Sequence, residues 1–179
     1  MKYIISSISF SLLIFACSIG TEESEALKDQ IVQSEKKVSQ STLGNSDSKD
    51  IMTEKSKLSD ALYTYYRQYP DDPYAANCLS KLHMLYSGMN ETDKAVAYAD
   101  TLLERYPDFI DRLQVIESQI ISYELDVRPR NVKMIKKYIK LWLKENTSAD
   151  YEKIDEMNYH LEHVDLSLEE RIKLNLEDF

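Results

Sequence analysis

The C-terminal two thirds of the chain contains long stretches in which apolar residues return every three or four positions. This spacing is typical of amphipathic helices packed against a core. Helix start signals punctuate the stretches, among them Asp72-Pro73 and the capping box that opens at Ser167. Together they predict an all-α domain over residues 51–179. Its seven helices are expected at about 52–68, 73–87, 91–105, 109–125, 131–145, 149–163 and 167–177.

Two of the predicted helices end in the same way, which indicates an internal repeat. Tyr69-Pro70 recurs 37 residues later as Tyr106-Pro107, and Asp follows each pair. A period of about 20–50 residues is typical of stacked copies of one supersecondary unit. We therefore expect helical hairpins that stack into a solenoid, with the core between neighbouring helices.

The first 50 residues have a different character. Lys2 precedes an apolar run over residues 3–16, which is too short to span a bilayer comfortably and ends at Ala16, directly before Cys17. A positive start, a short apolar run and a small final residue are features of a secretory signal peptide, predicted here over 1–16. Residues 17–50 are polar with sparse apolar side chains and are predicted as a flexible tether, with room for a transient helix at 25–38.

The charge of the chain is unevenly distributed. The formal net charge is −9, yet residues 128–144 carry seven basic and no acidic side chains, and residues 145–179 carry three basic and eleven acidic ones. A broad positive surface is what nucleic-acid binding requires, so this balance argues against a nucleic-acid partner.

The basic segment forms a stripe at helical spacing, made by Lys133, Lys137, Lys140 and Lys144. Ile135, Tyr138, Ile139 and Trp142 are predicted as the buried face of the same helix. Two interpretations stay open. The stripe is either a solvated surface that pairs with acidic residues of the last two helices (Asp150, Asp155 and Glu156), or a docking strip for an acidic partner or a lipid headgroup.

Motifs for catalysis are missing from the sequence. It has no glycine-rich phosphate loop, no G-x-S-x-G, no H-E-x-x-H and no C-x-x-C. Glu156, His160 and His163 share one helix face and are a conceivable metal-ligand set, but exposed polar residues on a helix explain them more simply. We expect a non-catalytic protein with no cofactor and no metal site.

The arrangement of residues around Cys17 resembles the lipobox of bacterial lipoproteins, in which signal peptidase II cleaves before a cysteine that then carries diacylglycerol. Residues 76–109 are similar to a tetratricopeptide repeat (TPR). The positions that carry this likeness are Leu79, Leu82, Tyr86, Ala95 and Pro107. The chain departs from that family at His83, where the family prefers glycine, and at Ala99, where it prefers a large aromatic residue.

Lipobox, tether and three TPR-like hairpins together resemble small TPR lipoproteins of the Bacteroidota and, more distantly, the TPR lipoprotein of the outer-membrane β-barrel assembly machine. The resemblance implies a protein anchored by lipid to the outer membrane, either periplasmic or surface-facing, that binds another envelope protein. A small-ligand or glycan-binding surface lipoprotein is the alternative.

Overall fold

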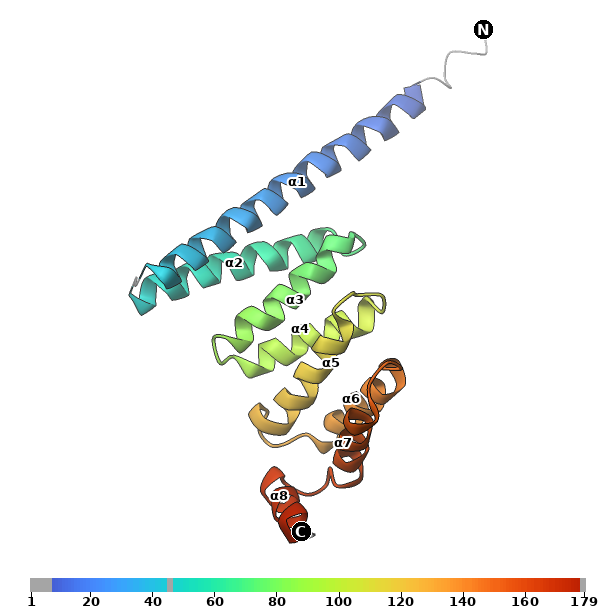
Figure 1. Cartoon of the computed structure of the whole chain (residues 1–179). Coiled ribbons are helices and arrows are strands. Elements are labelled where there is room, and N and C mark those ends of the chain that lie inside the picture. The colour runs from blue at the N-terminus through green and yellow to red at the C-terminus, as the bar shows by residue number, and fades with distance from the viewer. Residues whose placement is uncertain (1–7, 45–46, 178–179) are drawn as a thin grey trace. The chain divides into compact units, whose positions relative to one another are not determined.

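The computed structural model describes residues 8–44 and 47–177, and side chains over 22–44, 47–174 and at 176. Within these ranges the secondary structure is entirely helical, as predicted (Figure 1). The helices are α1 (Ile8–Leu43), α2 (Ser48–Gln68), α3 (Pro73–Ser87), α4 (Thr92–Arg105), α5 (Arg112–Ile121), the π-helix η1 (Ser122–Asp126), α6 (Val132–Glu145), α7 (Tyr151–Glu162) and α8 (Leu168–Glu177). The chain divides into two compact units, 1–82 and 83–179.

The predicted helix boundaries hold within a few residues because local signals set them. Asp72 accepts a hydrogen bond from the Tyr74 amide at 2.7 Å and so caps α3. The box at the start of α8 is reciprocal: Ser167 Oγ accepts from the Glu170 amide and Glu170 accepts from the Ser167 amide. The helices α2 and α4 both end one residue before a Tyr-Pro pair, as the repeat predicts.

The first unit corrects the expectation of a flexible tether. From Glu22 to Leu43 the chain belongs to α1, and α2 turns back along it (Figure 1). Partly or fully buried side chains recur along α1 at steps of four and three: Ser24, Lys28, Ile31, Glu35 and Val38. Ile31 is fully buried. Two other positions of the stripe, Lys28 and Glu35, are charged and have partners of opposite charge.

Those polar partners lie on α3 and just before it. Glu35 pairs with Lys81 at 2.6 Å, and Lys28 lies 3.5 Å from Asp72. Asp72 also accepts a hydrogen bond from the hydroxyl of fully buried Tyr65 at 2.9 Å. Burial, followed by this bond to Asp72, raises the pKa of Tyr65 to about 12. Sequence patterning could not reveal the two ion pairs, because each joins residues far apart in the chain.

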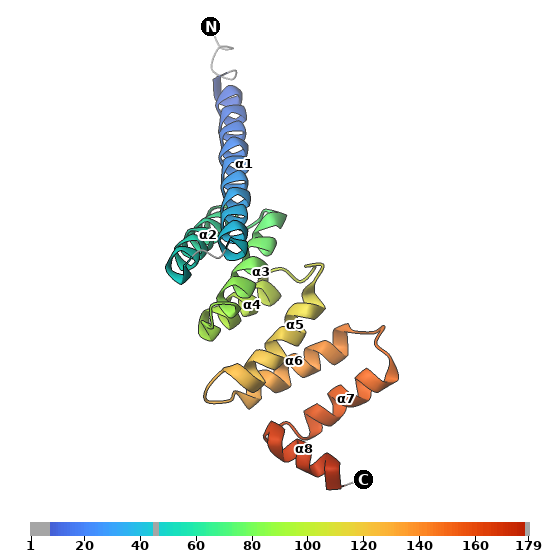
Figure 2. The ribbon, with the colours of Figure 1, turned by 60° about the vertical axis from the view of Figure 1, so that its left-hand side comes forward.

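The second unit packs α4, α5, α6 and α7 in succession, with α8 at its end (Figure 2). A polar cluster joins three of these helices. Asp100 on α4 accepts hydrogen bonds from Gln119 on α5, from Tyr123 on η1 at 2.8 Å and from Tyr138 on α6. Because all three donors are buried, the cluster fixes how α5 and α6 sit on α4.

His83 is a buried core residue. Its Nδ1 donates to the Ala95 carbonyl at 3.0 Å, so Nε2 of the neutral ring accepts from Ser118 Oγ at 2.9 Å. Burial lowers the pKa of His83, which agrees with a neutral ring. The larger residue at a position where the TPR pattern has glycine thus bridges α3, α4 and α5.

The repeat positions differ in burial. Leu79, Leu82 and Ala95 are buried, whereas Tyr86 is only half-buried and stacks on Tyr98 with ring centroids 5.5 Å apart. Pro107 is exposed just beyond the end of α4.

Candidate binding groove and basic strip

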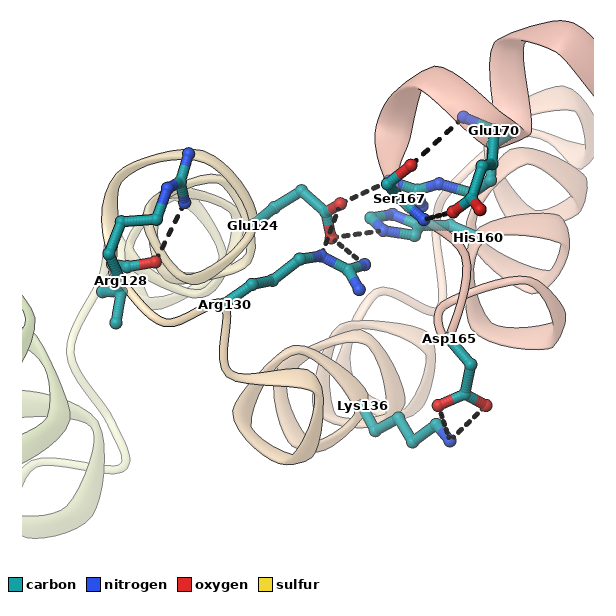
Figure 3. A network of polar contacts seen from close by, with 10 residues as sticks. Glu124, Arg128, Arg130, Lys136, His160, Asp165, Ser167 and Glu170 are labelled. Atoms are coloured by element: carbon teal, nitrogen blue, oxygen red, sulfur yellow. Dashed lines mark hydrogen bonds and ion pairs between the residues drawn. The ribbon is translucent and has the colours of Figure 1, made fainter.

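A buried carboxylate organises the C-terminal end of the second unit. Glu124 lies in η1, where the wider turn of a π-helix interrupts the regular helical register; such interruptions often occur at functional positions. Its Oε1 accepts from Arg130 Nε at 2.9 Å and its Oε2 from Arg130 Nη2 at 2.7 Å (Figure 3). Arg171 on α8 donates to Oε1 at 2.7 Å. Glu124 and Arg171 are both buried.

His160 on α7 is the third partner of this carboxylate (Figure 3). Its Nε2 lies 3.3 Å from Glu124 Oε2, and because an ionised carboxylate only accepts hydrogen bonds, Nε2 carries the proton. Burial and then the nearby charge of Arg171 lower the pKa of His160. Burial alone would raise the pKa of Glu124, but the hydrogen bonds and charges of Arg130 and Arg171 hold it below its usual value. One carboxylate therefore ties η1, α7 and α8 together.

A pocket of about 410 Å³ lies beside this cluster, between α5, η1, α7 and α8. Its wall includes Glu124, His160 and Arg171, and its remaining lining is largely aliphatic: Ile120, Ile121, Leu125, Met157, Leu168 and Ile172. Ile120 and Met157 are buried, whereas Ile121, Leu125, Leu168 and Ile172 are 43% to 55% exposed. We call these four exposed residues and the pocket between them the C-terminal groove.

The groove combines an apolar lining with an internally neutralised polar wall. Glu124 has its cationic partners, and Lys153 pairs with Glu156 at 3.0 Å. Such a surface offers contact area and shape, and the charged groups on its wall are already engaged. It is suited to binding an apolar surface.

The predicted basic strip is exposed on α6, while Ile135, Tyr138, Ile139 and Trp142 of the same helix are buried as predicted. Within the described part of the chain, no ion pair joins Lys133, Lys137, Lys140 or Lys144 to an acidic residue. The Lys137 ammonium lies 4.6 Å above the ring of Tyr138. The contact between α6 and the segment after α7 is made instead by Lys136, 3.0 Å from Asp165 (Figure 3).

This arrangement bears on the two interpretations of the strip. Its lysines do not pair with Asp150, Asp155 or Glu156; Glu156 pairs with Lys153 on its own helix. The interpretation in which the strip holds the last two helices in place is therefore not supported by contacts, and docking of an acidic surface stays a hypothesis.

Charge reversal in the strip is expected to leave folding intact. Changing Lys137 and Lys140 to Glu shifts the charge of an exposed face by four units, and exposed charges contribute less than about 1 kcal/mol each. The free energy of unfolding should change by less than about 1 kcal/mol, measured by urea denaturation followed by circular dichroism. If the strip binds an acidic partner, the affinity should fall several-fold and become less salt-dependent.

Lys136→Ala is the matched control, because it removes the one lysine of this helix with an ion pair to Asp165 and leaves the strip in place. A large loss of stability in the double charge reversal would show that the strip has a structural role. Unchanged partner binding would make its lysines ordinary solvated residues.

Of the remaining candidate positions, Glu156 and His160 line the pocket of the groove, and His163 does not. No side chain is described before Glu22, so the contacts of Cys17 are not described, and residues 1–7 of the predicted signal peptide lie outside the described residues. His163 Nδ1 donates to the Tyr159 carbonyl at 3.0 Å, and His160 faces Glu124. Among the described residues, no group of three His, Cys, Asp or Glu side chains is placed to hold a metal ion, and no helix has the length and apolarity to cross a membrane.

Sequence reasoning missed the groove. The available signal was Glu124 itself, an acidic residue within the apolar run that starts at Ile120. A charged residue there indicates a buried ion pair, but its partners come from Arg130, His160 and Arg171, and the spacing of these residues has no recognisable pattern. The chain matches no protein-family model, no curated protein and no solved structure. Its function therefore has to be inferred from its own residues.

Proposed function

We propose that this chain is a non-catalytic envelope lipoprotein, held on the outer membrane through acylated Cys17, whose TPR-like helical domain binds another protein. The observation that carries the proposal is the C-terminal groove, where four large aliphatic side chains remain exposed around one pocket. Exposed apolar clusters of this kind typically mark interaction sites. The lipobox-like sequence before Cys17 supports the anchor.

The alternative, a small-ligand or glycan-binding lipoprotein, draws on the pocket volume of about 410 Å³. Small-molecule sites usually bury about 70–90% of the ligand surface. Four of the aliphatic side chains around this pocket are about half exposed, so the site is open on that side. A glycan site would also need several free polar groups, whereas Glu124 and Arg171 already bond to each other. These features favour a protein partner.

Replacing Cys17 by alanine is expected to release the protein from the membrane. Two or more acyl chains hold a protein stably on a bilayer, because each buried methylene contributes roughly 0.8 kcal/mol. Full-length protein should move from the membrane pellet to the soluble fraction, measured by fractionation and immunoblotting after a carbonate wash.

The other cysteine provides the matched control. Cys78 is fully buried, so Cys78→Ala should leave the protein in the membrane pellet. Retention of the Cys17→Ala variant in washed membranes would exclude the lipid anchor. For the binding function, affinity purification of the lipidated chain from its native membranes should recover one protein in stoichiometric amount, and recovery of none would contradict the proposal.

A further inference from the structure

The exposed apolar surface of the C-terminal groove continues along α8. Leu168, Ile172 and Leu176 are spaced four residues apart and therefore share one face of the helix. Leu176 is 72% exposed. From Leu168 to Leu176 the helix rises about 12 Å, or roughly two turns. The groove is therefore an elongated track, longer than the pocket alone.

The opposite wall of the groove has the same spacing. Ile121 and Leu125 are also four residues apart, at the end of α5 and in η1, and both line the pocket that Leu168 and Ile172 line. Two apolar rows with a recess between them are the shape that receives the apolar face of a helix, whose side chains recur at three and four residues. An extended peptide directs alternate side chains to opposite faces, so it would contact the two apolar rows less well than a helix.

The charges around the groove limit which partner helices can bind there. From Tyr151 to Glu177 the sequence has eight acidic and three basic residues. Arg171 is buried on Glu124, and Lys153 pairs with Glu156. Lys173, next to Ile172, is exposed, and its charge contributes to lowering the pKa of Glu170. Asp126 follows Leu125, Glu169 follows Leu168, and both are exposed with no cationic partner among the described residues. The edge of the groove is therefore acidic, which disfavours anionic lipid and nucleic acid and favours cationic flanks on the occupant.

The polar wall of the groove is held in place before any partner binds. Glu124 connects η1 to α7 through His160 and to α8 through Arg171, with polar distances of 2.7 to 3.3 Å. The walls contributed by these three elements are thus fixed relative to one another. A preformed site loses less conformational entropy on binding, which raises affinity for a helix of matching shape.

We infer that the C-terminal groove binds an amphipathic helix of the partner protein, whose apolar face lies between Ile121, Leu125, Leu168 and Ile172 and whose flanks carry lysine or arginine. This inference rests on the proposed protein-binding function and names the surface and the chemistry of the partner. The basic strip on α6 is a separate surface and is not needed for it.

A model helix tests the groove directly. The probe is a fluorescein-labelled 18-residue peptide with leucine on one helical face and lysine elsewhere; a second peptide has glutamate in place of lysine. The protein is the full mature chain with Cys17→Ala, which removes only the acyl chains. Fluorescence anisotropy should show saturable binding of the lysine peptide, and at least tenfold weaker binding of the glutamate peptide.

Single substitutions locate the binding. Leu125→Ser and Ile172→Ser should each weaken the lysine peptide at least tenfold. Both side chains are about half exposed, so the variants are expected to keep the helical circular dichroism spectrum of the parent. Ile110→Ser is the matched control, because Ile110 is 90% exposed in the segment between α4 and α5 and lies outside the pocket lining. It should change the affinity less than twofold.

Several results would overturn the inference: equal losses in the Ile110→Ser control, equal binding of the two peptides, or absence of peptide binding. A dimer that sedimentation detects in the parent chain and that Ile172→Ser disperses would show that a second copy fills the groove instead. Binding of dodecanoate that Ile172→Ser abolishes, without peptide binding, would assign the groove to a small apolar ligand.

The native partner provides a second test, which separates this inference from the proposed function. A photo-crosslinking amino acid at position 172 of the lipidated chain should crosslink to a segment with an apolar face and basic flanks, mapped by mass spectrometry. The same group at position 110 should not crosslink to it. If the chain recovers its partner equally well with Ile172→Ser, the groove inference fails and the proposed function stands. If native membranes yield no partner although the model peptide binds, the proposed function fails.

Discussion

Replacing Glu124 by alanine is expected to lower the free energy of unfolding by about 3–5 kcal/mol, the range for removing one member of a buried ion pair. The substitution leaves the guanidinium of Arg171 buried without its carboxylate and removes the bonds of Arg130 and His160. The loss can be measured by urea denaturation. Trp142 is the only tryptophan of the chain and is fully buried, so its fluorescence reports on unfolding of the second unit.

The pH dependence identifies the cause of this loss. Because the pKa of Glu124 is held below its usual value, its contribution is fully present above that usual value. It is lost as the pH falls through the lowered pKa. The difference between the parent and the variant should therefore shrink in acid. Glu169→Ala is the control: Glu169 is an exposed acidic residue of α8, and its removal should change stability by less than about 0.5 kcal/mol.

An equally small loss for Glu124→Ala would mean that the buried cluster does not form. If only α8 comes loose, Trp142 fluorescence will change little while amide exchange of residues 168–177 accelerates. That result would place the effect in the walls of the groove, and binding of the lysine peptide would then weaken as well.

Leu82→Ala is expected to lower the free energy of unfolding by about 2–5 kcal/mol, because it removes most of a fully buried side chain and leaves a cavity. Sequence similarity to a TPR predicts the same loss for Tyr86→Ala. The structure changes that expectation: Tyr86 is half-buried and stacks on Tyr98, so its removal should cost only about 1–2 kcal/mol. Urea denaturation followed by circular dichroism measures both variants.

Met84 offers the matched control on the same helix. It is 66% exposed, and Met84→Ala should change stability by less than about 0.5 kcal/mol. Equal losses at Leu82 and Met84 would show that the buried face of α3 has been misplaced, and a loss below about 0.5 kcal/mol at Leu82 would show the same.

The helices from α2 onward could be located from sequence because their signals are local. Asp72 caps the helix that Pro73 begins, and each Tyr-Pro pair follows the end of a helix. Apolar residues recur at helical spacing in between, so type and boundaries come from neighbours within one or two turns. The exposed face of α6 was equally readable, since Ile135, Tyr138 and Trp142 define its buried side.

The first helix shows where this approach fails. Its buried stripe mixes Ser24, Lys28 and Glu35 with Ile31, and such a pattern looks polar by itself. The positions are buried because α2 packs along them and because Lys81 and Asp72 supply opposite charges. Composition alone therefore predicted a flexible tether, whereas the structure has a helix that packing against α2 stabilises.

The sequence by itself determined the all-α class, the ends of α2 and α4 and the exposed face of α6, because each depends on residues close together in the chain. Tertiary structure decided the packed first helix and the C-terminal groove. Glu124 becomes a buried anchor only when α7 and α8 bring His160 and Arg171 to it, from 36 and 47 residues away. The aliphatic residues of α8 and η1 form one surface for the same reason. Contacts at such separations follow from how the helices pack, and local sequence patterns do not predict them.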